Sequence, residues 1–127
     1  MIGICYNKNM LFKIPDYSGT YVILSKDTWN NKLLDPIFGH PEIRPYRKQI
    51  KQTITDPEFV YQSIWDTRCK LLLRRIGTGE FARHFLSVVV KYVTTENKEK
   101  IGYVSTIMIN RKLPASSMLL WQKKVSI

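Results

Sequence analysis

Few residues of this 127-residue chain are of the kinds that bind a metal ion or form a disulfide, since it has two cysteines and two histidines. Cys5 and Cys69 lie far apart in the sequence and outside any C-x-x-C spacing, and His40 and His84 are equally dispersed. Metal sites and disulfide frameworks are recognised by clustered spacing. We therefore expect two partly buried thiols, no metal and no cofactor, and any catalysis should be metal-independent.

Long apolar runs are also missing. The run at residues 88–90 is far shorter than a membrane span, and no basic amphipathic helix with a strongly apolar lipid face is present. Residues 1–6 lack the charged and apolar regions of a signal peptide. The sequence therefore predicts a cytoplasmic protein with no membrane partner.

Acidic residues are scarce: the chain has ten of them against 20 lysines and arginines, which gives a formal net charge of +10. The cations gather in three segments, residues 40–54, 66–84 and 111–127. Such an excess on one small surface points to a polyanionic partner.

One ordinary domain, residues 1–127, accounts for the length of the chain. A hairpin of 2–6 with 10–14 and an extended segment at 20–24 are expected first, followed by helices at 29–34 and 45–54. Strands are expected at 58–65, 70–76, 84–93 and 101–109, with a possible short fifth strand at 118–123. Short connections favour antiparallel neighbours. The predicted fold class is α+β, with N-terminal helices packed on a four-stranded, or five-stranded, antiparallel sheet.

The stretch around the second helix carries the strongest functional signal. His40 precedes Pro41 and stands beside Glu42, where it can act as a general acid or base or merely occupy an N-cap. Glu42 can orient the imidazole, take protons itself or complement the helix dipole. Four cations follow at i, i+3, i+4 and i+7, which is one face of a helix: Arg44, Arg47, Lys48 and Lys51. This face either tracks a phosphate backbone or is simply solvated.

Further candidates lie in the strand region. Strand alternation sends Arg74 and Arg75 to opposite faces, so one of them can clamp phosphate. Thr106 is a hydroxyl within an apolar strand, with a catalytic or a structural role. Trp121 beside Lys123 is typical of a stacking ring flanked by cations, although the ring can equally close the core.

Several motifs occur in a characteristic order: Trp29, His40-Pro41-Glu42, Asp56-Pro57-Glu58-Phe59-Val60, Leu73-Arg74, Val88-Val89-Val90-Lys91, Gly102-Tyr103-Val104-Ser105-Thr106 and Trp121. Over residues 20–124 this order resembles the phage-associated nuclease domains of the barnase–EndoU–colicin–RelE superfamily, in which helices precede a four-stranded antiparallel sheet. Ile107 and Met108 depart from the family pattern, which continues Thr-Ala-aromatic.

The resemblance implies a toxin-like, metal-independent endoribonuclease. In the reaction that the resemblance implies, a ribose 2′-OH of the RNA attacks the adjacent phosphate. The products carry a 2′,3′-cyclic phosphate and a 5′-OH. His40 would be the acid or base, with Glu42 its partner, Arg74 the phosphate clamp and Thr106 a hydrogen-bonding hydroxyl. Expected partners are RNA, such as tRNA or mRNA, and an acidic antitoxin or immunity protein. Two alternatives remain, a non-catalytic RNA-binding module and a module that binds an acidic protein.

Overall fold

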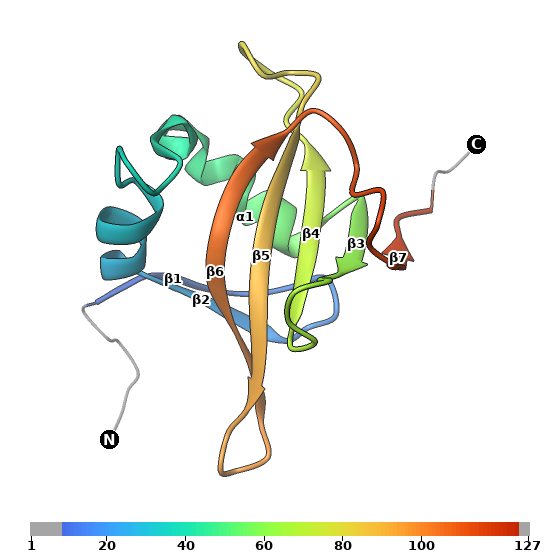
Figure 1. The fold of residues 1–127 in the computed structure, drawn as a ribbon. Coiled ribbons are helices and arrows are strands. Elements are labelled where there is room, and N and C mark those ends of the chain that lie inside the picture. Colours follow the sequence, from blue (N-terminus) through green and yellow to red (C-terminus); the bar gives the residue numbers. More distant parts are fainter. Residues whose placement is uncertain (1–8, 125–127) are drawn as a thin grey trace.

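The computed structural model describes residues 9–124, which form one seven-stranded sheet with helical segments on one side (Figure 1). The strands are β1 (Met10–Pro15), β2 (Tyr21–Ser25), β3 (Phe59–Gln62), β4 (Cys69–Arg75), β5 (Phe85–Thr94), β6 (Lys100–Asn110) and β7 (Leu119–Gln122). Between β2 and β3 lie the π-helical turn η1 (Thr28–Leu33), the 3-10 helix η2 (Pro41–Tyr46) and the α-helix α1 (Arg47–Thr55). The strands are ordered β1-β2-β6-β5-β4-β3-β7.

The predicted fold class is wrong. The sheet has seven strands, and it is mixed, because β2 pairs parallel with β6 through Val22 with Gly102 and Ile23 with Tyr103. The hairpin of β1 and β2 adds two strands beyond those expected after residue 58. Among the described residues, α1 is the one α-helix and has nine residues, so strands outweigh helices in this fold. None of the helices in the described part is long and apolar enough to cross a bilayer.

Most of the individual strands were predicted correctly. The four strands expected between residues 58 and 109 correspond to β3, β4, β5 and β6, which pair antiparallel in sequence order, and the possible fifth is β7, which pairs with β3. Of the first expected hairpin, residues 10–14 lie in β1, which pairs with β2 instead, and residues 2–6 lie outside the described residues. Local alternation therefore predicted strands correctly but did not predict all of their partners.

The sheet curves around the helical segments, and its concave face holds the main core. Alternate residues of β5, Leu86, Val88, Val90 and Tyr92, belong to this core together with Ile50 and Ile54 of α1. Curvature brings the two ends of the strand order together, because the ring centroid of Tyr17, in the turn after β1, lies 5.0 Å from that of Trp121 in β7. Figure 1 shows α1 behind the central strands, with β1 and β2 crossing behind them.

A buried carboxylate fixes the β1–β2 turn against the centre of the sheet. Asp16 accepts a hydrogen bond from the Tyr92 hydroxyl at 2.6 Å, and the backbone N–H groups of Ser18 and Thr20 donate to its other oxygen at 2.8 and 3.0 Å. Burial, followed by the bond to Asp16, raises the pKa of Tyr92 far above its ordinary value. The tyrosine therefore stays a donor, and the turn stays docked.

Gly102 on β6 has no room for a side chain. A Cβ built there lies 2.7 Å from Val90 Cγ1 and 3.0 Å from Val22 Cγ2, both of which are fully buried. Gly102→Ala should lower the free energy of unfolding by about 1–3 kcal/mol through overpacking. Urea denaturation measures this loss. Ser105→Ala on the same strand is the control and should change stability by no more than about 0.5 kcal/mol; equal stability of the two variants would contradict the tight packing.

Candidate nucleic-acid interface

The segment from η2 to α1 forms the scaffold of the candidate interface. Ile43, Ile50 and Ile54 are fully buried, with 0% exposure, and belong to the core on the concave face. Pro41 stands in the first turn of η2, where a missing N–H costs little, whereas Pro45 lies inside it. The α-helix therefore begins at Arg47, two residues later than the sequence predicted.

The four predicted cations of this segment all have exposed side chains. The Arg47 guanidinium lies 6.0 Å from the Trp29 ring, and Lys51 Nζ lies 5.7 Å from the Phe12 ring. Among the described residues, none of the four takes part in an ion pair. Arg44, Arg47, Lys48 and Lys51 are named the basic stripe below.

His40 and Glu42 stand together at the beginning of the same segment. His40 Nδ1 lies 3.7 Å from Glu42 Oε2, and both side chains are exposed to solvent by roughly two fifths, at 39% and 44%. This distance allows an ion pair when the imidazole is protonated but is too long for a hydrogen bond. His40 occupies the N-cap position of η2, yet its side chain makes no capping hydrogen bond. His40 therefore stands at the N-cap without its imidazole capping the turn.

Arg74 and Lys123 belong to a different cluster, at the C-terminal end of α1. Arg74 Nη1 donates to the backbone oxygen of Asp56 at 2.7 Å and to Asp56 Oδ2 at 3.1 Å, and Lys123 Nζ donates to the same Oδ2 at 2.9 Å. The hydrogen bond from Lys123 is the main reason that the pKa of Asp56 is lowered, with the charges of Lys123 and Arg74 adding to it. Both cations thus already have an anion.

Thr106 lies on the opposite, convex face of the sheet. The pairing of β5 with β6 shifts between Val89 and Val90, so that Val90 faces Val104 but Val89 faces Thr106. Strand alternation without this bulge would place Thr106 on the concave face with Val104. With the bulge, its neighbour Ile107 is buried in the core instead, and Thr106 points away from the side on which His40 stands.

Trp121 is half-buried and packs against both Tyr17 and the main core. Of its two possible roles, these contacts favour closing the core over stacking on a base. His40, Glu42 and the basic stripe therefore share one segment, residues 40–51, whereas Arg74, Thr106, Trp121 and Lys123 lie elsewhere.

Sequence reasoning missed a second group of cations, at the other end of the central strands. Lys70 Nζ and Lys100 Nζ lie 5.3 and 5.0 Å from the Tyr92 ring. Burial lowers the pKa of Lys70, and the nearby charge of Lys100 lowers it further. Only the strand pairing places these lysines on one ring, so their 30-residue separation carried no sequence signal.

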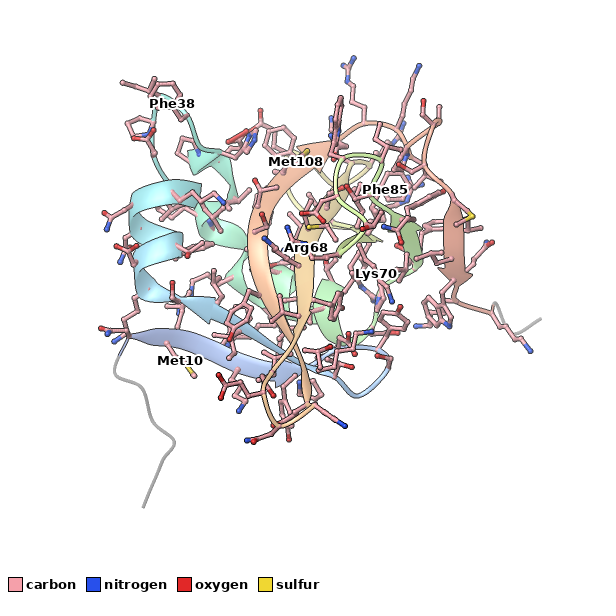
Figure 2. The ribbon with its side chains drawn as sticks, turned by 60° about the horizontal axis from the view of Figure 1, so that its bottom comes forward. Met10, Phe38, Arg68, Lys70, Phe85 and Met108 are labelled. Carbon is pink, nitrogen blue, oxygen red and sulfur yellow. The ribbon has the colours of Figure 1, made fainter. Side chains whose placement is uncertain are left out.

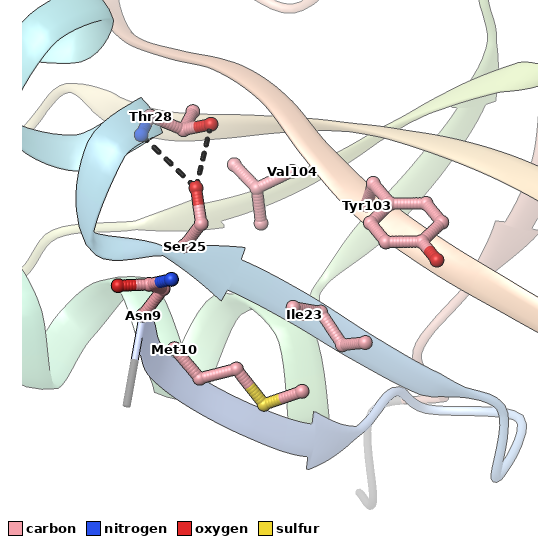
Figure 3. A pocket seen from close by; sticks show the side chains of 7 residues that line it. All are labelled: Asn9, Met10, Ile23, Ser25, Thr28, Tyr103 and Val104. Atoms are coloured by element: carbon pink, nitrogen blue, oxygen red, sulfur yellow. Dashed lines mark hydrogen bonds between the residues drawn. The ribbon is translucent and has the colours of Figure 1, made fainter. Parts of the chain in front are cut away.

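A cavity of about 370 Å³ opens where β2 and β6 part after their short parallel pairing (Figure 3). Its lining comes from Asn9, Met10, Ile23, Ser25, Thr28, Tyr103 and Val104. The Ser25 hydroxyl donates to Thr28 Oγ1 at 2.9 Å and accepts from the Thr28 N–H at 3.0 Å. No residue of the basic stripe lines this cavity. The part of the chain that the structure describes also holds no group of three or more metal-binding side chains.

Asp56 offers a test of the cluster at the end of α1. Lys123→Gln should raise the pKa of Asp56 more than Arg74→Gln, because the bond from Lys123 contributes most to the shift. A titration of the carboxyl carbon by NMR measures both shifts, and equal shifts would contradict the geometry. The ion pairs of Asp56 with Lys123 and Arg74 lower the pKa of Asp56 in the folded state. Their contribution to stability is therefore fully present above the ordinary carboxyl pKa and is lost as the pH falls through the lowered pKa. Asp56 is exposed, so this loss should stay below about 1 kcal/mol.

Comparison of the chain with protein-family models, with curated proteins and with solved structures finds no match in any of the three. The resemblance to the nuclease superfamily therefore stays a prediction.

Proposed function

We propose that this protein binds RNA through the basic stripe of η2 and α1. The observation that carries this proposal is the exposure of four cations on one short segment, none of which forms an ion pair among the described residues. A phosphate backbone supplies the missing negative charge, and the net charge of +10 strengthens its attraction. The choice of RNA over DNA comes from the superfamily resemblance.

Binding by this surface breaks no existing ion pair of the described residues. Among the described residues, Arg44 and Lys48 have no charged partner to give up. Arg47 and Lys51 lie beside aromatic rings, which leave the positive charge available while restricting the side chains. Cations that are restricted in this way lose less conformational entropy when they bind. Arg74 and Lys123, in contrast, would have to leave Asp56.

The salt dependence of binding tests this proposal. For the double variant Arg44→Gln/Lys48→Gln, the slope of log affinity against log salt should flatten by about 1.4, because each lost phosphate contact on a single strand contributes about 0.7. Fluorescence anisotropy over a salt series measures the slope.

A matched control removes two exposed cations from other loops, Lys98→Gln/Lys112→Gln. Its slope should stay close to that of the wild type. A stripe variant with the wild-type slope, or a control that flattens equally, would mean that the basic stripe is only a solvated face.

The second candidate function is metal-independent ribonuclease activity, which the 3.7 Å approach of His40 to Glu42 favours. In this proposal one of the two groups takes the proton of the ribose 2′-OH as the oxygen attacks the adjacent phosphorus. His40 as imidazolium can return a proton to the departing 5′ oxygen. A cation such as Arg44 would stabilise the phosphorane charge. Arg74 and Thr106 take no part, because of where they lie. An acidic antitoxin would then inhibit the enzyme by covering the basic stripe.

His40→Ala separates the two functions. If the protein is a ribonuclease, this variant should cleave about 10²–10⁴-fold more slowly, because it lacks the proton-transferring imidazole, and should bind RNA as the wild type does. Glu42→Gln should cost less if Glu42 only orients His40. Cleavage is followed in EDTA with end mapping, which should find 2′,3′-cyclic phosphates.

Other outcomes are equally informative. Cleavage that stops in EDTA and returns with Mg²⁺ would overturn the metal-independent mechanism, and a fully active His40→Ala would remove this histidine from it. A further outcome is that the wild-type protein, with any antitoxin removed, binds RNA and yet cuts neither free nor ribosome-bound message. That result would make the protein a binding module.

A further inference from the structure

The loop between η1 and η2 presents two large apolar side chains to solvent. Ile37 is 78% exposed and Phe38 is 90% exposed. Figure 2 shows Phe38 at the tip of this loop, pointing away from the body of the molecule. Exposure of this extent gains nothing for folding, so the two side chains are available to a partner.

The backbone of this loop is held in place by its own hydrogen bonds. The Phe38 N–H donates to Asp35 Oδ2 at 2.7 Å, the Gly39 N–H donates to the Asp35 backbone oxygen at 2.9 Å, and the His40 N–H donates to the Leu33 backbone oxygen at 2.7 Å. A Cβ at Gly39 would collide with the backbone oxygens of Lys32, Leu33 and Asp35. Phe38 is therefore presented by a tight, specified turn.

Along the chain, this ring stands two residues before His40, at the start of the candidate interface. Phe38 and His40 are two residues apart, so their Cα atoms are no more than about 7 Å from each other. Arg44 and Lys48 follow on η2 and α1, and Lys32 stands exposed at the end of η1. An exposed ring beside cations is the arrangement that single-stranded nucleic acid requires, since bases stack on the ring while cations hold the backbone.

We propose that Phe38 stacks on an unpaired RNA base whose neighbouring phosphates lie along His40 and the basic stripe. This stacking rests on the proposed RNA binding. The surface then selects single strands over duplexes, because paired bases cannot reach the ring. A lipid surface fits less well, since membrane-bound helices offer an extended apolar face, whereas the apolar residues of η2 and α1 are buried in the core.

The test compares a single-stranded RNA with its duplex, both 2′-O-methylated so that attack by a 2′-OH cannot destroy them. Phe38→Ala should weaken single-strand binding by about 5- to 150-fold, because one base stack contributes about 1–3 kcal/mol. Duplex binding should not change. Phe38→Trp should keep the single-strand affinity, and Phe38→Leu, which is apolar but not aromatic, should lose most of it.

Trp65→Ala is the matched control, because Trp65 is 91% exposed on the loop between β3 and β4. It should bind both RNAs as the wild type does. Wild-type protein that binds neither RNA at low salt overturns the proposed function and this inference together. RNA binding that Phe38→Ala leaves unchanged, or that Phe38→Leu keeps in full, overturns the stacking role alone. Phe38-dependent binding to anionic vesicles, with RNA affinity unaffected, would assign the loop to a membrane instead.

Discussion

Burial of three isoleucines on one side of η2 and α1 is the constraint on which the candidate interface depends. Ile43, Ile50 and Ile54 are completely enclosed by the concave face of the sheet, and each contributes about 1.5–3 kcal/mol of hydrophobic stabilisation. A nine-residue helix with a 3-10 turn before it would not persist alone in water. The sheet therefore provides the stability of this segment, and the same packing turns Arg44, Arg47, Lys48 and Lys51 outward.

The concave face exists because the sheet is held in its curved form. Asp16 connects the β1–β2 turn to Tyr92 of the central strand β5, and Tyr17 connects it to Trp121 at the far edge. The short parallel pairing of β2 with β6 joins the hairpin to the other strands. Asp56 adds a tie at the end of α1 by holding Arg74 and Lys123. Within residues 9–124, the cations paired with Asp56 are thus distinct from those of the basic stripe, which take part in no ion pair.

The sequence predicted what depends on local periodicity. The exposure of Arg47, Lys48 and Lys51 agrees with the 3.6-residue spacing of α1, whereas Arg44 lies in the 3-10 helix η2. The strands β3 to β6 followed from alternation, which neighbouring residues decide. The parallel pairing of β2 with β6 joins residues about 80 positions apart and left no local signal. A single bulge in β6 turns Thr106 to the convex face. Arg74, predicted as a phosphate clamp, forms an ion pair with Asp56 instead. Phe38 did have a signal, since an aromatic residue between Pro36 and Gly39 in a loop has no core to enter.

RNA binding as proposed uses one continuous surface, from the loop before η2 to the end of α1. Backbone amide shifts of isotope-labelled protein, recorded by NMR while a single-stranded RNA is added, test it most directly. We expect the largest shift changes within residues 37–51 and little change on the convex face around Thr106. Changes centred on Lys70 and Lys100, or on the cavity between β2 and β6, with residues 37–51 unaffected, would contradict it.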